Sequence, residues 1–316
     1  MVTKERIRAF LGVEPARWLS FVDSADFEKV TEIRLRADKP MLLKMAGRDY
    51  AVAESSLGQA RLITDIDAHA FRPTAADIAE TVERISQYSF YAFESELKMG
   101  YLTLPGGHRV GVAGQAVIED GSVRTWRHIS SLAIRVAHSI PGCADDVLPH
   151  IIGTSLFHTM IISPPGFGKT TLLRDIVRQI SDGAVGRPGM TVGLVDERSE
   201  VAGCFQGVPQ NDVGLRTDVL DSCTKAEGMV MLLRALAPDV IAVDELGGRK
   251  DARAVEDVLN AGVKLLCTAH GSSVEDVKAN PGLAELVNRG VFERYIVLSG
   301  PGIIEGIYDG GVKYAA

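Results

Sequence analysis

The stretch that decides the fold is residues 158–181, which read HTMIISPPGFGKTTLLRDIVRQIS. A short apolar run predicts a buried strand at 158–163. A loop with two prolines and two glycines follows at 164–169, and residues 170–181 then place apolar side chains at helical spacing. The stretch therefore predicts a strand, a loop and a helix in succession.

The loop at 163–171 is close to the phosphate-binding pattern G-x-x-x-x-G-K-[ST], with Ser163 in the place of the first glycine. Glycines let the backbone approach a phosphate, and amides at the start of a helix attract an anion. A Gly-Lys turn that merely begins an ordinary helix is the alternative. We expect Lys169 to contact the β- and γ-phosphates of ATP and Thr170 to bind Mg²⁺. The expected nucleotide-binding residues are Pro164, Pro165, Gly166, Phe167, Gly168, Lys169, Thr170 and Thr171.

The chain after residue 150 alternates apolar strand-like runs with amphipathic helical runs, which predicts a parallel sheet with helical crossovers. Beyond the opening strand and helix, strands are expected at 190–196, 238–245, 263–270, 295–299 and 303–308, and helices at 225–237 and 251–262.

The chain before residue 150 shows short strand-like runs and glycine-containing turns. Ile33 and Leu35 alternate with charged residues, as in a half-buried strand. Thr74 can cap a helix over 74–93, and three or four strands fit residues 96–137. We therefore expect two domains, an N-terminal α+β domain at 1–150 and a second domain at 151–316.

Composition narrows the class of protein. The 316 residues are 46% hydrophobic and 24% charged, typical of a soluble globular protein. No apolar stretch approaches the roughly 18 residues of a membrane span, and the charged N-terminus lacks a signal-peptide core. The four cysteines lie far apart with no CxxC pair, which favours a reducing cytosol over a disulfide framework or a zinc site. A cytoplasmic protein is expected.

The net charge argues against a nucleic-acid partner. Lysine and arginine number 34 against 41 aspartates and glutamates, so the chain carries −7. A domain that coats DNA or RNA is usually basic.

Two carboxylates end the apolar run at 238–243. Asp244 can hold Mg²⁺ through water, and Glu245 can orient and deprotonate an attacking water. A solvated pair of acids on a loop is the alternative.

Further polar residues end two other predicted strands. Asp196, Glu197 and Glu200 could complete a shell of water around Mg²⁺, although acids that cap a helix start would look similar. His270 would lie beside the nucleotide, although a lone histidine is more often structural. Ligands of open α/β sheets bind beyond the carboxyl ends of the strands, which is where these residues are expected.

Two arginines lie on predicted strands of the first half. Arg109 and Arg135 could be ordinary exposed strand residues. They could also reach the nucleotide of a neighbouring subunit and neutralise charge on the transferring phosphoryl group.

In this order the motifs resemble the hexameric ATPases of type II and type IV secretion, pilus assembly and pilus retraction. The resemblance implies a RecA-like core with a P-loop at 163–171, a Walker B motif at 244–245 and a histidine box at 268–270. It also assigns family roles to residues of this chain: Glu245 as catalytic base, Asp196, Glu197 and Glu200 as acidic box, His270 as the conserved histidine, and Arg109 and Arg135 as the N-terminal arginines. Three features depart from the family: Asp244 stands where many relatives have glycine, the acidic box reads DERSE, and no tetra-cysteine insert is present.

Within that superfamily the whole chain resembles the stage III sporulation protein AA family of endospore-forming bacteria. The stretches that carry this resemblance include EIRLRADKP at 32–40, IISPPGFGKTTLLRD at 161–175 and PDVIAVDELG at 238–247. The resemblance implies a mother-cell ATPase that works with membrane proteins of the channel complex between mother cell and forespore.

We therefore expect an α/β protein with a RecA-like P-loop ATPase core, a mostly parallel sheet and a smaller N-terminal α+β domain. Its expected function is that of an ATP-hydrolysing motor with ATP and Mg²⁺ as cofactors. Arginines supplied in trans would favour a homo-oligomeric ring, which the resemblance makes a hexamer. Three alternatives remain open: a nucleic-acid-dependent translocase, a nucleotide-locked assembly subunit, and a small-molecule phosphotransferase.

Overall fold

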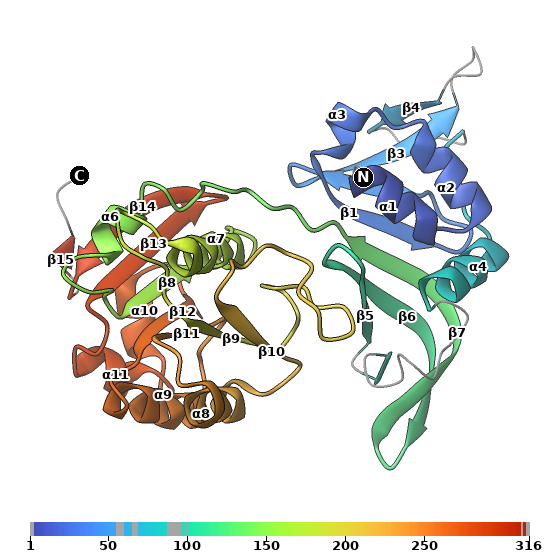
Figure 1. Ribbon diagram of the computed structural model, residues 1–316. Coiled ribbons are helices and arrows are strands. Elements are labelled where there is room, and N and C mark those ends of the chain that lie inside the picture. Colours follow the sequence, from blue (N-terminus) through green and yellow to red (C-terminus); the bar gives the residue numbers. More distant parts are fainter. Residues whose placement is uncertain are drawn as a thin grey trace. The chain divides into compact units, whose positions relative to one another are not determined.

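The computed structural model describes residues 3–54, 60–64, 69–86, 97–98, 100–310 and 312–313. The chain forms two compact units, Met1–His138 and Ser139–Ala316, each built around one sheet (Figure 1). Residues 139–150 therefore pack with the second unit, where they include α6 (Leu148–Ile151).

The first unit contains a seven-stranded antiparallel sheet in the order β4-β3-β2-β1-β7-β6-β5. Its strands are β1 (Val30–Arg36), β2 (Leu42–Met45), β3 (Arg48–Glu54), β4 (Ala60–Ile63), β5 (Tyr101–Leu104), β6 (His108–Glu119) and β7 (Ser122–Arg135). Its helices are α1 (Thr3–Phe10), α2 (Val13–Ser20), α3 (Ser24–Phe27) and α4 (Ala75–Ile85).

Alternation along β1 places one side of this sheet in the core. Ile33 and Leu35 are fully buried, and Ile33 lies opposite Ile134 of β7 and Leu43 of β2. Helix α4 begins at a capping box formed by Thr74 with Asp77 and packs on β1 and β7. This start was predicted from the sequence, whereas residues 87–93 of the expected helix lie outside the described residues.

The second unit contains an eight-stranded sheet in the order β10-β9-β11-β12-β8-β13-β14-β15. The first six strands in this order are parallel to one another, and β14 and β15 each pair antiparallel with the strand before them. Its strands are β8 (Thr159–Ser163), β9 (Val192–Asp196), β10 (Thr217–Asp221), β11 (Val240–Val243), β12 (Lys264–His270), β13 (Arg294–Gly300), β14 (Ile303–Asp309) and β15 (Val312–Lys313). Its longer helices are α7 (Lys169–Asp182), α8 (Lys225–Leu236) and α9 (Arg249–Asn260), and its shorter ones besides α6 are α10 (Val274–Ala279) and α11 (Ala284–Asn288).

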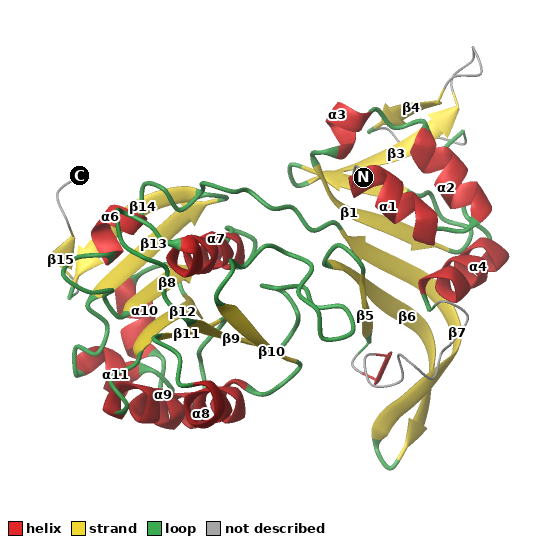
Figure 2. Ribbon diagram, in the orientation of Figure 1, coloured by secondary structure: helices red, strands yellow, loops and turns green. Residues whose placement is uncertain are grey.

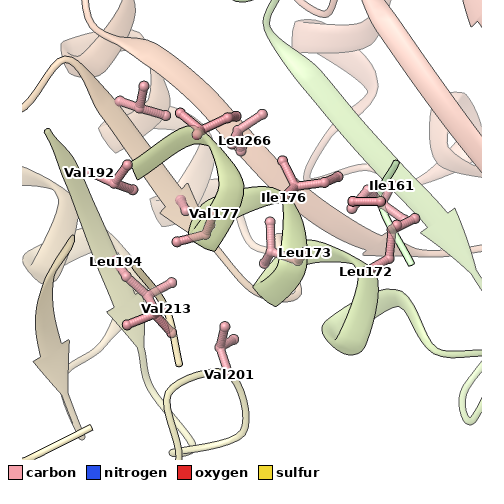
Figure 3. Packing of buried hydrophobic residues seen from close by; sticks show 14 of the residues in the cluster. Ile161, Leu172, Leu173, Ile176, Val177, Val192, Leu194, Val201, Val213 and Leu266 are labelled. Atoms are coloured by element: carbon pink, nitrogen blue, oxygen red, sulfur yellow. The ribbon is translucent and has the colours of Figure 1, made fainter. Parts of the chain in front are cut away.

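Helices cover both faces of this sheet (Figure 2), which explains why its central strands are mostly apolar and buried along their whole length. On one face α7 packs Leu173, Ile176 and Val177 toward residues of β9 and β12 (Figure 3). On the other face α8 and α9 cover a second cluster that includes Ile162, Val243 and Cys267. No helix among the described residues is both long enough and apolar enough to cross a bilayer.

The strand order determines which sequence motifs meet. Strand β12 lies between β8 and β11, so the end of β12 separates the loop after β8 from the acids after β11. Because these strands are parallel, their carboxyl ends share one edge of the sheet. Ser163, Asp196, Asp244 and His270 all lie at or directly after a strand end on that edge.

Removing part of a buried leucine of α7 should destabilise the second unit. Leu173 is 0% exposed and packs on the sheet, whereas Leu215 is 86% exposed. We expect Leu173→Ala to lower the free energy of unfolding by about 3–5 kcal/mol, and the matched Leu215→Ala to change it by about 0.5 kcal/mol or less. Chemical denaturation followed by circular dichroism measures both. Equal losses in the two variants would contradict the packing described here.

Candidate functional site

The loop between β8 and α7 has the backbone that the sequence pattern requires. Gly166 and Gly168 have φ angles of 80° and 92°, a left-handed region that favours glycine. Ser163 is the buried last residue of β8, so its backbone is extended and a side chain is tolerated where the pattern has glycine. The Gly302 amide, in the turn between β13 and β14, donates a hydrogen bond to the Phe167 carbonyl at 3.2 Å. The C-terminal hairpin thus supports this loop.

The other residues of this segment differ in exposure. Pro165 and Gly166 are exposed, while Pro164, Phe167 and Thr171 are half-buried. Phe167 also packs against the apolar cluster beneath α7.

Lys169 is a buried cation whose partner is Glu245. Its Nζ lies 2.8 Å from Glu245 Oε1, and His270 Nε2 lies 3.0 Å from the same oxygen. Arg198 approaches the other carboxylate oxygen at 3.4 Å. Burial would raise the pKa of Glu245, but the hydrogen bond and charge of Lys169, with the charges of His270 and Arg198, outweigh it and lower that pKa. Glu245 is therefore an ionised carboxylate at neutral pH.

Asp244 is brought together with Thr170 and Thr268. Thr170 Oγ1 donates to Asp244 Oδ2 at 2.9 Å, and Thr268 Oγ1 donates to Asp244 Oδ1. Burial raises the pKa of Asp244 despite these two hydrogen bonds, and the neighbouring charge of Glu245 adds to the rise while Lys169 opposes it.

The donor set fits Mg²⁺. This cation takes hydroxyl and carboxylate oxygens, and proteins commonly bind it through one or two carboxylates together with substrate phosphates. Thr170 and Asp244 present such oxygens 2.9 Å apart. Within the described residues no cluster of three or more histidine, cysteine, aspartate or glutamate side chains could hold a metal by itself.

Asp196 shapes the loop after β9 through hydrogen bonds to its backbone. Its Oδ1 accepts a hydrogen bond from the Glu200 amide at 2.8 Å, and its Oδ2 accepts from Val201 and Ala202 at 3.1 and 2.8 Å. Arg174 of α7 donates to the carbonyls of Glu200 and Val201. One buried acid and one buried base thus both bond to the backbone of the loop after β9.

The other two acids of this loop border a small hollow. Glu197 forms an ion pair with Lys225 at the start of α8. The Glu200 amide donates to Asp196, and the Glu200 carbonyl accepts from Arg174. Glu200 also lines the hollow. The acids that end β9 and β11 converge here, and the lining residues are Asp196, Glu197, Arg198, Glu200, Lys225, Asp244 and Glu245.

Arg109 and Arg135 belong to the first unit, where they lie directly opposite each other on β6 and β7. The Arg109 guanidinium stacks over the Tyr101 ring at 3.6 Å from its centroid. Arg135 is exposed, with Nε 3.9 Å from Glu32 Oε2. The two arginines therefore share one face of the first sheet.

Sequence reasoning missed three residues that support the site. Arg174 and Lys225 look like ordinary helix residues, and Gly302 looks like part of a hairpin turn. Their partners are 26 or more positions away along the chain. No local pattern signals such contacts.

A known protein family matches almost the whole chain. The family described as sporulation stage III, protein AA matches residues 1–313. The chain belongs to this family. Stage III sporulation protein AA of Bacillus subtilis (strain 168) is 40% identical over 294 residues, which cover 92% of this chain and 90% of that protein.

Solved structures confirm the fold class of this stage III AA family member. The Legionella pneumophila ATPase DotB is similar with a TM-score of 0.56 and 16% identity, over 90% of this chain and 76% of that one. The pilus retraction motor PilT with bound ADP gives 0.51 and 16%, over 86% and 75%. The chain therefore has the predicted mixed α/β fold with a RecA-like core.

Burial should make Asp196 a pH-sensitive element of stability. Burial raises the pKa of Asp196 from 3.8 to about 6, although hydrogen bonds from three backbone amides act to lower it. The native state then binds this proton more tightly than the unfolded chain, so the stabilisation is present below pH 4 and is lost as the pH rises through 6. We expect the stability of wild type relative to Asp196→Asn to be greater at pH 4 than at pH 7, by about 2 kcal/mol. Urea unfolding at both pH values tests this, and a difference that does not change with pH would contradict it.

Proposed function

We propose that this chain is an ATP-hydrolysing motor of the secretion-ATPase type that acts in sporulation. One observation carries the proposal: Lys169 and Thr170, at the start of α7, directly contact Glu245 and Asp244 at the end of β11. A cation, a hydroxyl and two carboxylates gathered at one edge of a parallel sheet are what phosphoryl transfer requires. Membership of the stage III AA family and the folds of DotB and PilT support the same function.

Each residue of the site has its own role in the proposed hydrolysis. Backbone amides of residues 166–171 bind phosphate oxygens, and Lys169 adds a positive charge beside them. Thr170 and Asp244 hold Mg²⁺, which when bound neutralises charge on the phosphates. Glu245 stays ionised and so can accept a proton from the attacking water, while His270 orients the same carboxylate. Asp196, Glu197 and Glu200 contribute through the loop that borders this carboxylate pair.

The proposed working form is a homo-oligomeric ring of six subunits. The exposure of Arg135, and the place of Arg109 directly across from it, support a role at a neighbouring subunit's nucleotide. A head-to-tail interface of this kind closes into a ring when its rotation permits. The resemblance to secretion ATPases supplies the number six. The proposed partners are membrane proteins of the channel between mother cell and forespore, reached from the mother-cell cytoplasm.

Two substitutions should separate nucleotide binding from turnover. Lys169→Ala removes the buried charge that meets the phosphates, so we expect ATP binding to be lost. Glu245→Gln removes the proton acceptor and frees Lys169, so we expect ATP to remain bound while turnover falls at least about 100-fold. Calorimetric titration and phosphate release measure these effects. Glu285→Gln, at a side chain that is 79% exposed, is the matched control and should behave as wild type.

The same measurements can contradict the proposal. Wild-type turnover in Glu245→Gln would exclude Glu245 as the base. ATP binding without turnover in the wild type would indicate a nucleotide-locked subunit, and stimulation by DNA with strong salt dependence would indicate a nucleic-acid motor.

Mixing two inactive variants should test whether Arg135 acts across a subunit boundary. Arg135→Ala subunits keep Glu245, and Glu245→Gln subunits keep Arg135, so a mixed ring contains some complete sites. We expect the mixture to regain part of the wild-type phosphate-release rate at protein concentrations that support assembly. Activity no higher than the sum of the two separate variants would favour a structural role for Arg135.

A further inference from the structure

We propose that Thr268 is the positioning residue that sets the geometry of Asp244 and Glu245, an inference that rests on the proposed function for its effect on turnover. Thr268 is fully buried in β12, the strand between β8 and β11. The preceding residue, Cys267, lies beside Val243, the last residue of β11. Thr268 therefore lies at the level where the chain leaves β11 and the two acids begin.

Thr268 holds three consecutive residues after β11. Its Oγ1 accepts a hydrogen bond from the Glu245 amide at 2.8 Å, and the same hydroxyl donates to Asp244 Oδ1. Its carbonyl accepts from the Leu246 amide at 2.9 Å. One side chain thus links the backbone of one acid to the carboxylate of the other.

The backbone at Glu245 explains why such a link is needed. Its φ angle of 57° is left-handed, which a residue with a side chain rarely adopts without support. In this conformation the carboxylate meets Lys169 and His270. The hydrogen bond from the Glu245 amide to Thr268 stabilises that conformation directly.

A hydroxyl is suited to this place because it can donate and accept at the same time. Serine retains both functions. Valine has nearly the shape of threonine but can neither accept from the Glu245 amide nor donate to Asp244. The pair Thr268→Ser and Thr268→Val therefore isolates the hydroxyl from the packing of β12.

Amide hydrogen exchange of the nucleotide-free protein tests the positioning without any reaction. In Thr268→Val we expect the Glu245 amide to exchange at least about 10-fold faster, because its acceptor is gone, while the amides of Ala242 and Val243 stay as protected as in wild type. Thr268→Ser should keep wild-type protection at Glu245. Unchanged exchange of that amide in Thr268→Val would overturn the inference, as would equal acceleration throughout β11.

Steady-state kinetics tests the consequence for turnover. We expect Thr268→Val to lower kcat at least about 10-fold with the KM for ATP within about threefold of wild type, and Thr268→Ser to restore most of kcat. Thr159→Val is a matched control, because Thr159 is also buried and its hydroxyl donates to the Phe157 carbonyl at the opposite end of β8. Equal losses in Thr268→Val and Thr159→Val would indicate a structural role and overturn the inference.

The two tests distinguish this inference from the proposed function. If wild type hydrolyses ATP and Thr268→Val does so equally well, the inference fails and the proposed function stands. If wild type hydrolyses no ATP, the proposed function fails, and the exchange of the Glu245 amide still decides whether Thr268 positions the acids.

Discussion

The buried charge of Lys169 is the constraint on which the arrangement of this site depends. A cation removed from water needs a partner close by, and Glu245 supplies it at 2.8 Å. That partner comes from a strand two positions away in the sheet, so the contact requires the order β8-β12-β11. It also requires the left-handed turn at Glu245. The Lys169–Glu245 ion pair therefore depends on the sheet order, on the turn at Glu245 and on the loop before α7.

A second pair of buried charges keeps the neighbouring loop in place. Asp196 accepts hydrogen bonds from the backbone amides of residues 200–202, and Arg174 donates to the carbonyls of residues 200 and 201. Among the described residues no buried side-chain nitrogen or oxygen lacks a hydrogen-bond partner. Such fully satisfied polar networks favour one conformation over others. We infer that the rigidity of this edge of the sheet comes from polar contacts as much as from the apolar clusters beneath it.

Local patterns were enough to predict most of the elements, including the strand, loop and helix at residues 158–181. Apolar runs identified the central strands, and helical spacing of Leu173 and Ile176 identified α7. Strand β10 was missed because it lies at the edge of the sheet, where two of its five residues are aspartates. The hydrogen bonds from three backbone amides to Asp196 could not be predicted, because its place at a strand end does not show which groups its oxygens meet. The proposed positioning role of Thr268 depends on its contacts with Asp244 and Glu245, which lie more than 20 residues away in sequence. No local pattern indicates such contacts.

The central claim is that the edge of the sheet around Lys169 and Asp244 binds a nucleoside triphosphate with Mg²⁺. A crystal structure of the protein with a non-hydrolysable ATP analogue and Mg²⁺ tests it most directly. We predict that the phosphates lie against the amides of residues 166–171, with Lys169 beside them and the metal next to Thr170 and Asp244. An analogue bound elsewhere, with the Lys169–Glu245 ion pair untouched and no metal beside Thr170, would contradict the account.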